Sequence, residues 1–261
     1  VKKEINMMKH HYIVTFENGT IRISSHEPIY SSDKLKYIVM IANFLHSYMK
    51  SEYKLNAYIY LTNLKKTINE KDNSYFGVPE VNSGYCSFDN NIATKLVVWR
   101  KEDSIKVFIH EMIHYFKFDN HFINKFKSIN SIVKPIQITK NNDNSFEAFT
   151  DYYAITIYCI MLYMLDKNTH YNDHYNDMIL YTENLCKTIY YHSNNNINNI
   201  INNDSNVFSY YVLKYGLFKT KTFLFKLTDI KKIIIDNHNY FIKNKLNYSK
   251  SLAMVNKQIY L

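Results

Sequence analysis

Two histidines flank a glutamate at a spacing that suits metal-assisted hydrolysis. His110, Glu111 and His114 form an HExxH motif within residues 107 to 116. On an α-helix, residues four positions apart project from one face, so both imidazoles can bind the same zinc ion. The glutamate between them can reach a water at that metal. The motif therefore predicts a zinc-dependent hydrolase and favours a peptidase.

The residues around the motif predict how a helix would hold it. Helical spacing extends from about Asp103 to Phe118, with Asp103 or Ser104 as the N-cap. At about 100° per residue, six apolar side chains share one broad side of this helix. The two histidines fall on the opposite side, with Glu111 just beyond them. We expect the apolar side to be buried and the polar triplet to point into an adjoining space. A surface helix with two solvated histidines is the alternative.

A catalytic zinc ion needs a third protein ligand and one open position for water. Glu147 lies 33 residues after His114 (147 − 114), which leaves room for a loop and a returning helix. Asp151 follows on the same helix face, so one carboxylate can bind metal while the other accepts a hydrogen bond from a ligating histidine. Asn144 followed by Glu147 also fits a capping box, which needs no metal. Asp119, His121 and Asp143 are further candidates for the third ligand.

HExxH followed by a helix that carries ExxxD resembles the gluzincin class of zinc metallopeptidases, the thermolysin-like group. The resemblance is confined to these two segments and the chain between them. It implies that one Zn²⁺ is bound by His110, His114 and Glu147. It also implies that Glu111 is the general base of peptide-bond hydrolysis and that Asp151 supports His110. No third histidine follows at the distance that the metzincin pattern requires.

The resemblance also implies a residue that stabilises the oxyanion of the reaction. Gluzincins use a Tyr or His outside the motif for this purpose. The candidates in this chain are Tyr210 and Tyr211, with Tyr153 and His192 behind them. Packing of the tyrosines within a helix is the competing interpretation.

A short segment upstream of the motif is a candidate for substrate binding. In gluzincins an edge strand before HExxH pairs with the backbone of the peptide substrate by strand addition. The residues at a suitable distance are Asn82, Ser83, Gly84 and Tyr85. Gly84 would let a peptide approach closely. An ordinary loop that enters a strand explains the same residues.

The amino-acid composition indicates a protein with a substantial core and argues against nucleic-acid binding. The 261 residues are 46% hydrophobic and 16% aromatic, which is enough for a substantial core. The net charge is +9, but the basic residues are dispersed and no nucleic-acid-binding motif accompanies them, so nucleic acid is an unlikely partner. The expected partner is a peptide or protein substrate.

The cysteines and the apolar runs predict an intracellular, cytoplasmic protein. Cys86, Cys159 and Cys186 are an odd number at spacings unlike a disulfide or CxxC pattern, and Cys159 falls in an apolar run typical of a core. The first residues lack the apolar core of a signal peptide. The longest apolar stretch, Ala154 to Leu165, has 12 residues, which predicts a buried helix and no membrane span.

The order of elements predicts an α+β fold: an N-terminal twisted mixed sheet with a backing helix, then a mainly helical, zincin-like part. Glu17–Gly19 form a turn signal between the two strands of an expected hairpin. Alternation of apolar and polar residues indicates the other strands, and helical spacing indicates the helices. Strands are expected at 11–16, 20–24, 56–64, 85–88 and 95–100, and a helix at 32–50.

We divide the chain into a sheet lobe, residues 1–118, which ends in the HExxH helix, and a helical lobe, residues 119–261, which carries the third ligand. The asparagine-rich run 192–206 predicts a mobile loop or a boundary. Two helices are expected after it, at 207–218 and 219–235. Two other functions share these features: an inactive zinc-binding interaction protein on a peptidase scaffold, and a zinc amidase that cleaves a non-peptide bond.

Overall fold

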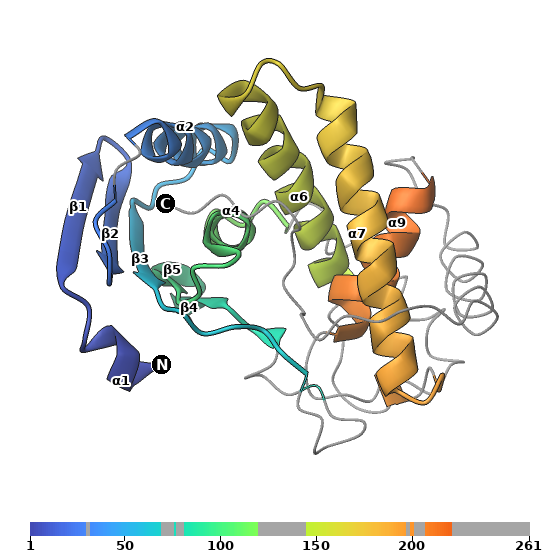
Figure 1. The fold of residues 1–261 in the computed structure, drawn as a ribbon. Helices are drawn as coiled ribbons and strands as arrows, with labels where there is room; N and C mark the ends of the chain where they lie inside the picture. The colour runs from blue at the N-terminus through green and yellow to red at the C-terminus, as the bar shows by residue number, and fades with distance from the viewer. Residues whose placement is uncertain are drawn as a thin grey trace.

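A sheet and a set of helices lie on either side of the helix that carries HExxH. The computed structural model describes residues 1–29, 32–68, 76, 81–119, 145–196, 199–200 and 207–220. Helix α4 (Ser104–Tyr115) lies between the sheet with α2 (Ser32–Tyr48) on one side and α6 (Ser145–Leu165) with α7 (Tyr171–His192) on the other (Figure 1). A short helix, α1 (Lys2–Ile5), precedes the sheet. This arrangement confirms the α+β layout.

The sheet contains parallel and antiparallel strands, and one of its two edge strands contacts α4. Its strands are β1 (His10–Phe16), β2 (Gly19–Ser25), β3 (Leu55–Leu61), β4 (Gly84–Asp89) and β5 (Ile92–Val98). They are arranged in the order β1-β2-β3-β5-β4, with β2, β3 and β5 parallel and the outer strands antiparallel to their neighbours. Both β1 and β4 are therefore edge strands, and β4 contacts α4.

Turn residues explain the two hairpins. The first hairpin turns before Gly19, where an added Cβ would lie 2.5 Å from the carbonyl oxygen of Leu55, so glycine permits the close approach of β2 to β3. The second turns at Asn90 and Asn91, whose φ values are 47° and 63°. Two consecutive left-handed residues form the turn that matches strand twist, and asparagine tolerates this conformation. As a result β5 begins at Ile92, earlier than expected.

A continuous apolar core joins the sheet, α2, α4 and the later helices. The inward residues of β2 and β3 alternate with partly exposed ones, as in a strand with one buried face. Helix α4 is buried on nearly all sides, and only His114 among its residues is partly exposed. The expectation of a helix at 103–118 is confirmed for most of its length. The helix ends three residues early, because Lys117 takes a left-handed φ of 57°.

Helix α6 is longer than the apolar run in the sequence suggested, with 21 residues where the run has 12. Among the described residues it is the one helix long and apolar enough to cross a membrane, judged by length and composition alone. Of its most apolar 18-residue stretch, 61% is buried inside the protein, as in a core helix. The 12-residue run therefore understated the length of this helix. The prediction of a buried helix agrees with its packing, and the absence of a membrane span stays a prediction.

The last described elements are η2 (Phe208–Leu213), a π-helix, and α9 (Lys214–Thr220), which continues it. They fall where a helix was expected at 207–218. Most of the next expected helix, residues 221–235, and much of the asparagine-rich run lie outside the described residues. All three cysteines are free, and Cys159 is buried in the core as expected.

Candidate metal centre

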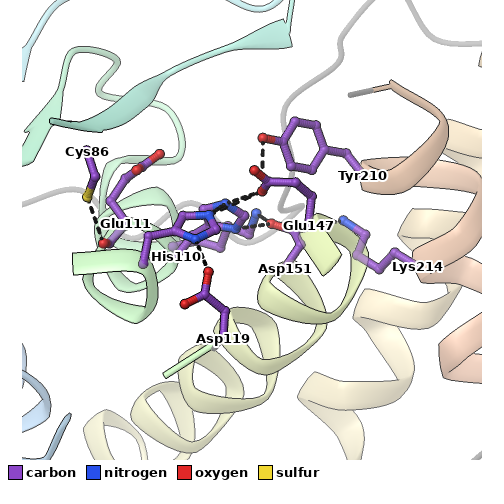
Figure 2. A network of polar contacts seen from close by, with 10 residues as sticks. Cys86, His110, Glu111, Asp119, Glu147, Asp151, Tyr210 and Lys214 are labelled. Carbon is purple, nitrogen blue, oxygen red and sulfur yellow. Dashed lines mark hydrogen bonds and ion pairs between the residues drawn. The ribbon is translucent and has the colours of Figure 1, made fainter. Parts of the chain in front are cut away.

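Three side chains from two helices converge on one point. His110 and His114 project from α4, and Glu147 projects from the first turn of α6. The two histidine Nε2 atoms are 3.0 Å apart. Glu147 Oε2 lies 3.1 Å from Nε2 of His110 and 3.2 Å from Nε2 of His114 (Figure 2). These three residues form a group that could hold a metal ion.

The spacing of the three atoms is slightly shorter than the spacing that a zinc ion requires. Two ligand atoms about 2.0–2.2 Å from zinc at the tetrahedral angle lie roughly 3.3 Å apart. The observed separations of 3.0, 3.1 and 3.2 Å fall just below this value. Small outward shifts of the side chains would thus admit the ion. Two imidazole nitrogens and one carboxylate oxygen are also a donor set that catalytic zinc sites use.

Asp151 lies where the sequence placed it, one helical turn after Glu147. Its Oδ1 is 3.1 Å from Nδ1 of His110, and the carboxylate is fully buried. An imidazole that donates its Nδ1 hydrogen to a carboxylate carries its lone pair on Nε2. Asp151 therefore fixes the tautomer in which His110 presents Nε2 to the metal position.

Asp119 gives His114 the same support, which sequence reasoning missed. Its Oδ2 lies 2.6 Å from Nδ1 of His114. The chain reverses after α4 in a Schellman turn, in which the N–H of Lys117 donates to the His114 carbonyl and that of Phe118 donates to the Ile113 carbonyl. This turn brings Asp119 back to the helix. Asp119 was a candidate for the third ligand, but it lies at the histidine nitrogen that faces away from the metal position. His121 and Asp143, the two remaining candidates for that ligand, lie outside the described residues.

Two buried lysines contact Asp151 and were also not anticipated. Lys106 Nζ contacts Oδ1, and Lys214 Nζ lies 2.5 Å from Oδ2. Lys106 precedes His110 by four residues, so helical spacing alone could have placed it on the same side of α4. Burial lowers the pKa of Lys214 to about 7 and, with the nearby Lys214 charge, holds the pKa of Lys106 well below its usual range.

The electrostatics of the centre favour a cation between its carboxylates. Burial lowers the pKa of His110 to about 3, so this imidazole is neutral. Burial opposes the charged form of His114 too, but Glu147 and Asp119 hold its pKa well above the usual value. Burial would raise the pKa of Glu147, yet the two histidines hold it below its usual range. In the absence of a metal, the positive charge beside Glu147 is therefore that of His114. A bound metal ion would place its own positive charge at the same position.

The three converging side chains and Glu111 line one open cavity, which has a volume of about 650 Å³. The Glu111 side chain extends from α4 toward β4 (Figure 2). Burial raises the pKa of this carboxyl to about 7, well above that of a solvated glutamate. Cys86 on β4 donates a hydrogen bond of 3.0 Å to the Glu111 carbonyl oxygen and ties the strand to the helix at this point.

Of the two tyrosines proposed for the oxyanion, only Tyr210 lies at the centre. It lines the cavity, and its hydroxyl donates to Glu147 Oε2 at 3.4 Å. Tyr211 is fully buried and does not line the cavity, because adjacent residues of η2 face different sides. Placing it among the catalytic residues was therefore wrong. Neither Tyr153 nor His192 lines the cavity either.

The segment proposed for substrate binding borders the cavity along edge strand β4. Asn82, Gly84 and Tyr85 line the cavity, whereas Ser83 is buried and faces a small space behind it. A Cβ added to Gly84 would lie 2.8 Å from Glu111 Oε1 and equally close to the Val107 side chain. Glycine is therefore required for the contact between β4 and α4. Helix α4 occupies the space on this side of Gly84, and the close approach of a peptide to Gly84 stays a prediction.

Comparison of the chain with family models, with curated proteins and with solved structures gives no match. The geometry of the metal centre therefore carries the functional proposal.

Proposed function

We propose that this protein is a zinc-dependent metallopeptidase of the gluzincin type, with His110, His114 and Glu147 as ligands of one Zn²⁺. The observation that supports this most directly is the convergence of three ligand atoms, 3.0 to 3.2 Å apart, at the wall of an open cavity. A structural zinc site is enclosed by four protein ligands, whereas a catalytic site keeps one position open. The open cavity therefore favours catalysis over a purely structural role.

The carboxylates on both histidines support the same proposal. Each Nδ1 faces an aspartate, Asp151 for His110 and Asp119 for His114. Both Nε2 atoms are consequently unprotonated when a metal is bound, and each can donate its lone pair to the metal beside Glu147. Such outer partners orient ligands and raise their basicity, and their loss commonly lowers metal affinity or activity by roughly 10- to 100-fold.

The residues around the metal position have separate roles in the proposed reaction. Bound zinc supplies an acidified water and polarises the carbonyl of the scissile bond. Glu111 accepts the water proton and passes it to the leaving amine, a task that suits a carboxylate whose pKa is raised to about 7. The Tyr210 hydroxyl donates a hydrogen bond to the oxyanion that develops as the carbonyl is attacked. Edge strand β4 aligns the peptide by backbone hydrogen bonds.

The test combines metal analysis with peptide cleavage. We expect purified protein to carry one zinc per chain by mass spectrometry and to cleave an unstructured peptide library, with cleavage lost on chelation and restored by zinc. Glu111→Gln should retain the zinc and lose the cleavage. A protein that binds zinc but cleaves no peptide would support the inactive binding protein instead, and one that cleaves only non-peptide amides would support the amidase.

A further inference from the structure

Asp151 has more partners than the support of one histidine requires. Besides His110 Nδ1, its carboxylate contacts Lys106 from α4 and Lys214 from α9, so three helices meet at one fully buried group. Both lysine side chains are buried about as completely as the aspartate. Burying an ammonium group costs several kcal/mol unless its pairing is close. The contact from Lys214 on α9 is the one that the support of His110 does not need.

Lys214 belongs to a pair of matched contacts between α6 and the continuous helix η2–α9. Glu147 and Asp151 are four residues apart on α6, and Tyr210 and Lys214 are four residues apart on η2–α9. The Tyr210 hydroxyl contacts Glu147 Oε2 at 3.4 Å, and Lys214 Nζ contacts Asp151 Oδ2 at 2.5 Å (Figure 2). The two contacts thus join the two helices in one register, and the stronger one is the buried ion pair.

This register decides whether Tyr210 reaches the centre. The contact of its hydroxyl with Glu147 is long for a hydrogen bond and cannot hold the helix alone. A charged pair in a dry interior has a strict geometry, because any displacement leaves the Lys214 ammonium buried away from its carboxylate partner. A shift of η2–α9 by one residue would therefore break the Lys214 pair and turn Tyr210 away from the cavity.

We propose that Lys214 is a positioning residue: its ion pair with Asp151 sets the register of η2–α9 on α6 and so holds the Tyr210 hydroxyl at the metal centre. This inference rests on the proposed function, because it assigns Lys214 a role in that centre. Lys106 contacts the same carboxylate from the helix that carries His110. The loss of Lys106 should therefore act on that histidine directly.

The test is a double-mutant cycle on zinc-saturated protein. We expect Lys214→Met and Tyr210→Phe each to lower kcat by roughly 10- to 100-fold with KM little changed. Their combination should lose no more than the larger single loss, because both remove the same interaction. Lys106→Met combined with Tyr210→Phe should show losses that multiply. Lys219→Met, an exposed position on the same helix, is the matched control and should match wild type.

A second measurement is independent of activity. The visible spectrum of the Co²⁺-substituted protein reports the geometry of the metal site, and we expect Lys214→Met to change it while Lys219→Met does not. If the methionine variant fails to fold by circular dichroism, Lys214→Gln keeps a hydrogen-bond donor and takes its place, with a smaller change expected. Multiplying losses with Tyr210→Phe, or an unchanged spectrum, would overturn the positioning role. Wild-type protein that binds neither zinc nor cobalt would instead overturn the proposed function.

Discussion

Removing the charge of Glu111 should stabilise the metal-free protein. Its carboxyl is buried at the wall of the cavity, and burial raises its pKa from 4.5 to about 7. A raised carboxyl pKa means that the folded state binds this proton more tightly than the unfolded state does. The free energy of unfolding therefore falls as the pH rises from the unfolded pKa to the folded one. Glu111→Gln is neutral at every pH and escapes this loss.

The magnitude follows from the two pKa values. Each pKa unit corresponds to about 1.4 kcal/mol, so a difference of about 2.5 units gives roughly 3 kcal/mol once both states are ionised. That full difference is reached at about pH 8. At about pH 5.5 the folded carboxyl is still protonated and the unfolded one is mostly ionised, so the advantage of the variant is only about 1 kcal/mol.

Urea denaturation of the chelator-treated wild type and variant at these two pH values measures the difference. We expect Glu111→Gln to be more stable at both, with an advantage that grows by about 2 kcal/mol toward the higher pH. Glu52→Gln, which removes an exposed carboxylate, should show no such change. A variant whose advantage is constant with pH, or which is less stable than wild type at about pH 8, refutes the reasoning. Zinc should reduce the advantage, because a nearby dication favours the ionised carboxylate.

Three further outcomes test the centre. Glu147→Ala should lower bound zinc sharply in metal analysis by mass spectrometry, and an unchanged stoichiometry would remove Glu147 from the ligand set. Asp119→Asn should weaken zinc binding roughly 10- to 100-fold in a chelator competition, whereas equal affinity would mean that His114 needs no such partner. Gly84→Ala should destabilise the protein by about 1–3 kcal/mol in thermal or urea unfolding, because the new Cβ meets Glu111. A neutral result there would show that β4 is free to move away from α4.

Local periodicity predicted the parts of the centre that lie on regular helices. The histidine pair and the Glu147–Asp151 pair each have a spacing of four, which puts them on one face of any α-helix. The structure brings both pairs together. Lys106 obeys the same spacing relative to His110 and could have been found in this way. Lys106 was not considered because a charged lysine is expected on the protein surface, and buried lysines are rare unless they are paired.

Contacts that depend on turns or on distant packing could not be predicted. Asp119 reaches His114 only because Lys117 adopts a left-handed conformation, and lysine gives no signal of it where glycine or asparagine would. Lys214 is 63 residues from Asp151, so their pairing depends on how the last helix packs. The turn at Asn90–Asn91 did carry a signal, but the abundance of asparagine in this chain hid it.

Because η2 is a π-helix, the number of residues in this segment determines how Tyr210 and Lys214 are placed relative to each other. A π-helix commonly arises when one residue is inserted into an α-helix. Deleting one residue between Tyr210 and Lys214 would remove the wide turn and leave these two side chains three residues apart on an α-helix. Their spacing would then no longer match that of Glu147 and Asp151, which are four residues apart on α6, although every side chain of the centre would still be present. Related chains that keep the chemistry should therefore keep the residue count between these two positions, even where the residues themselves differ.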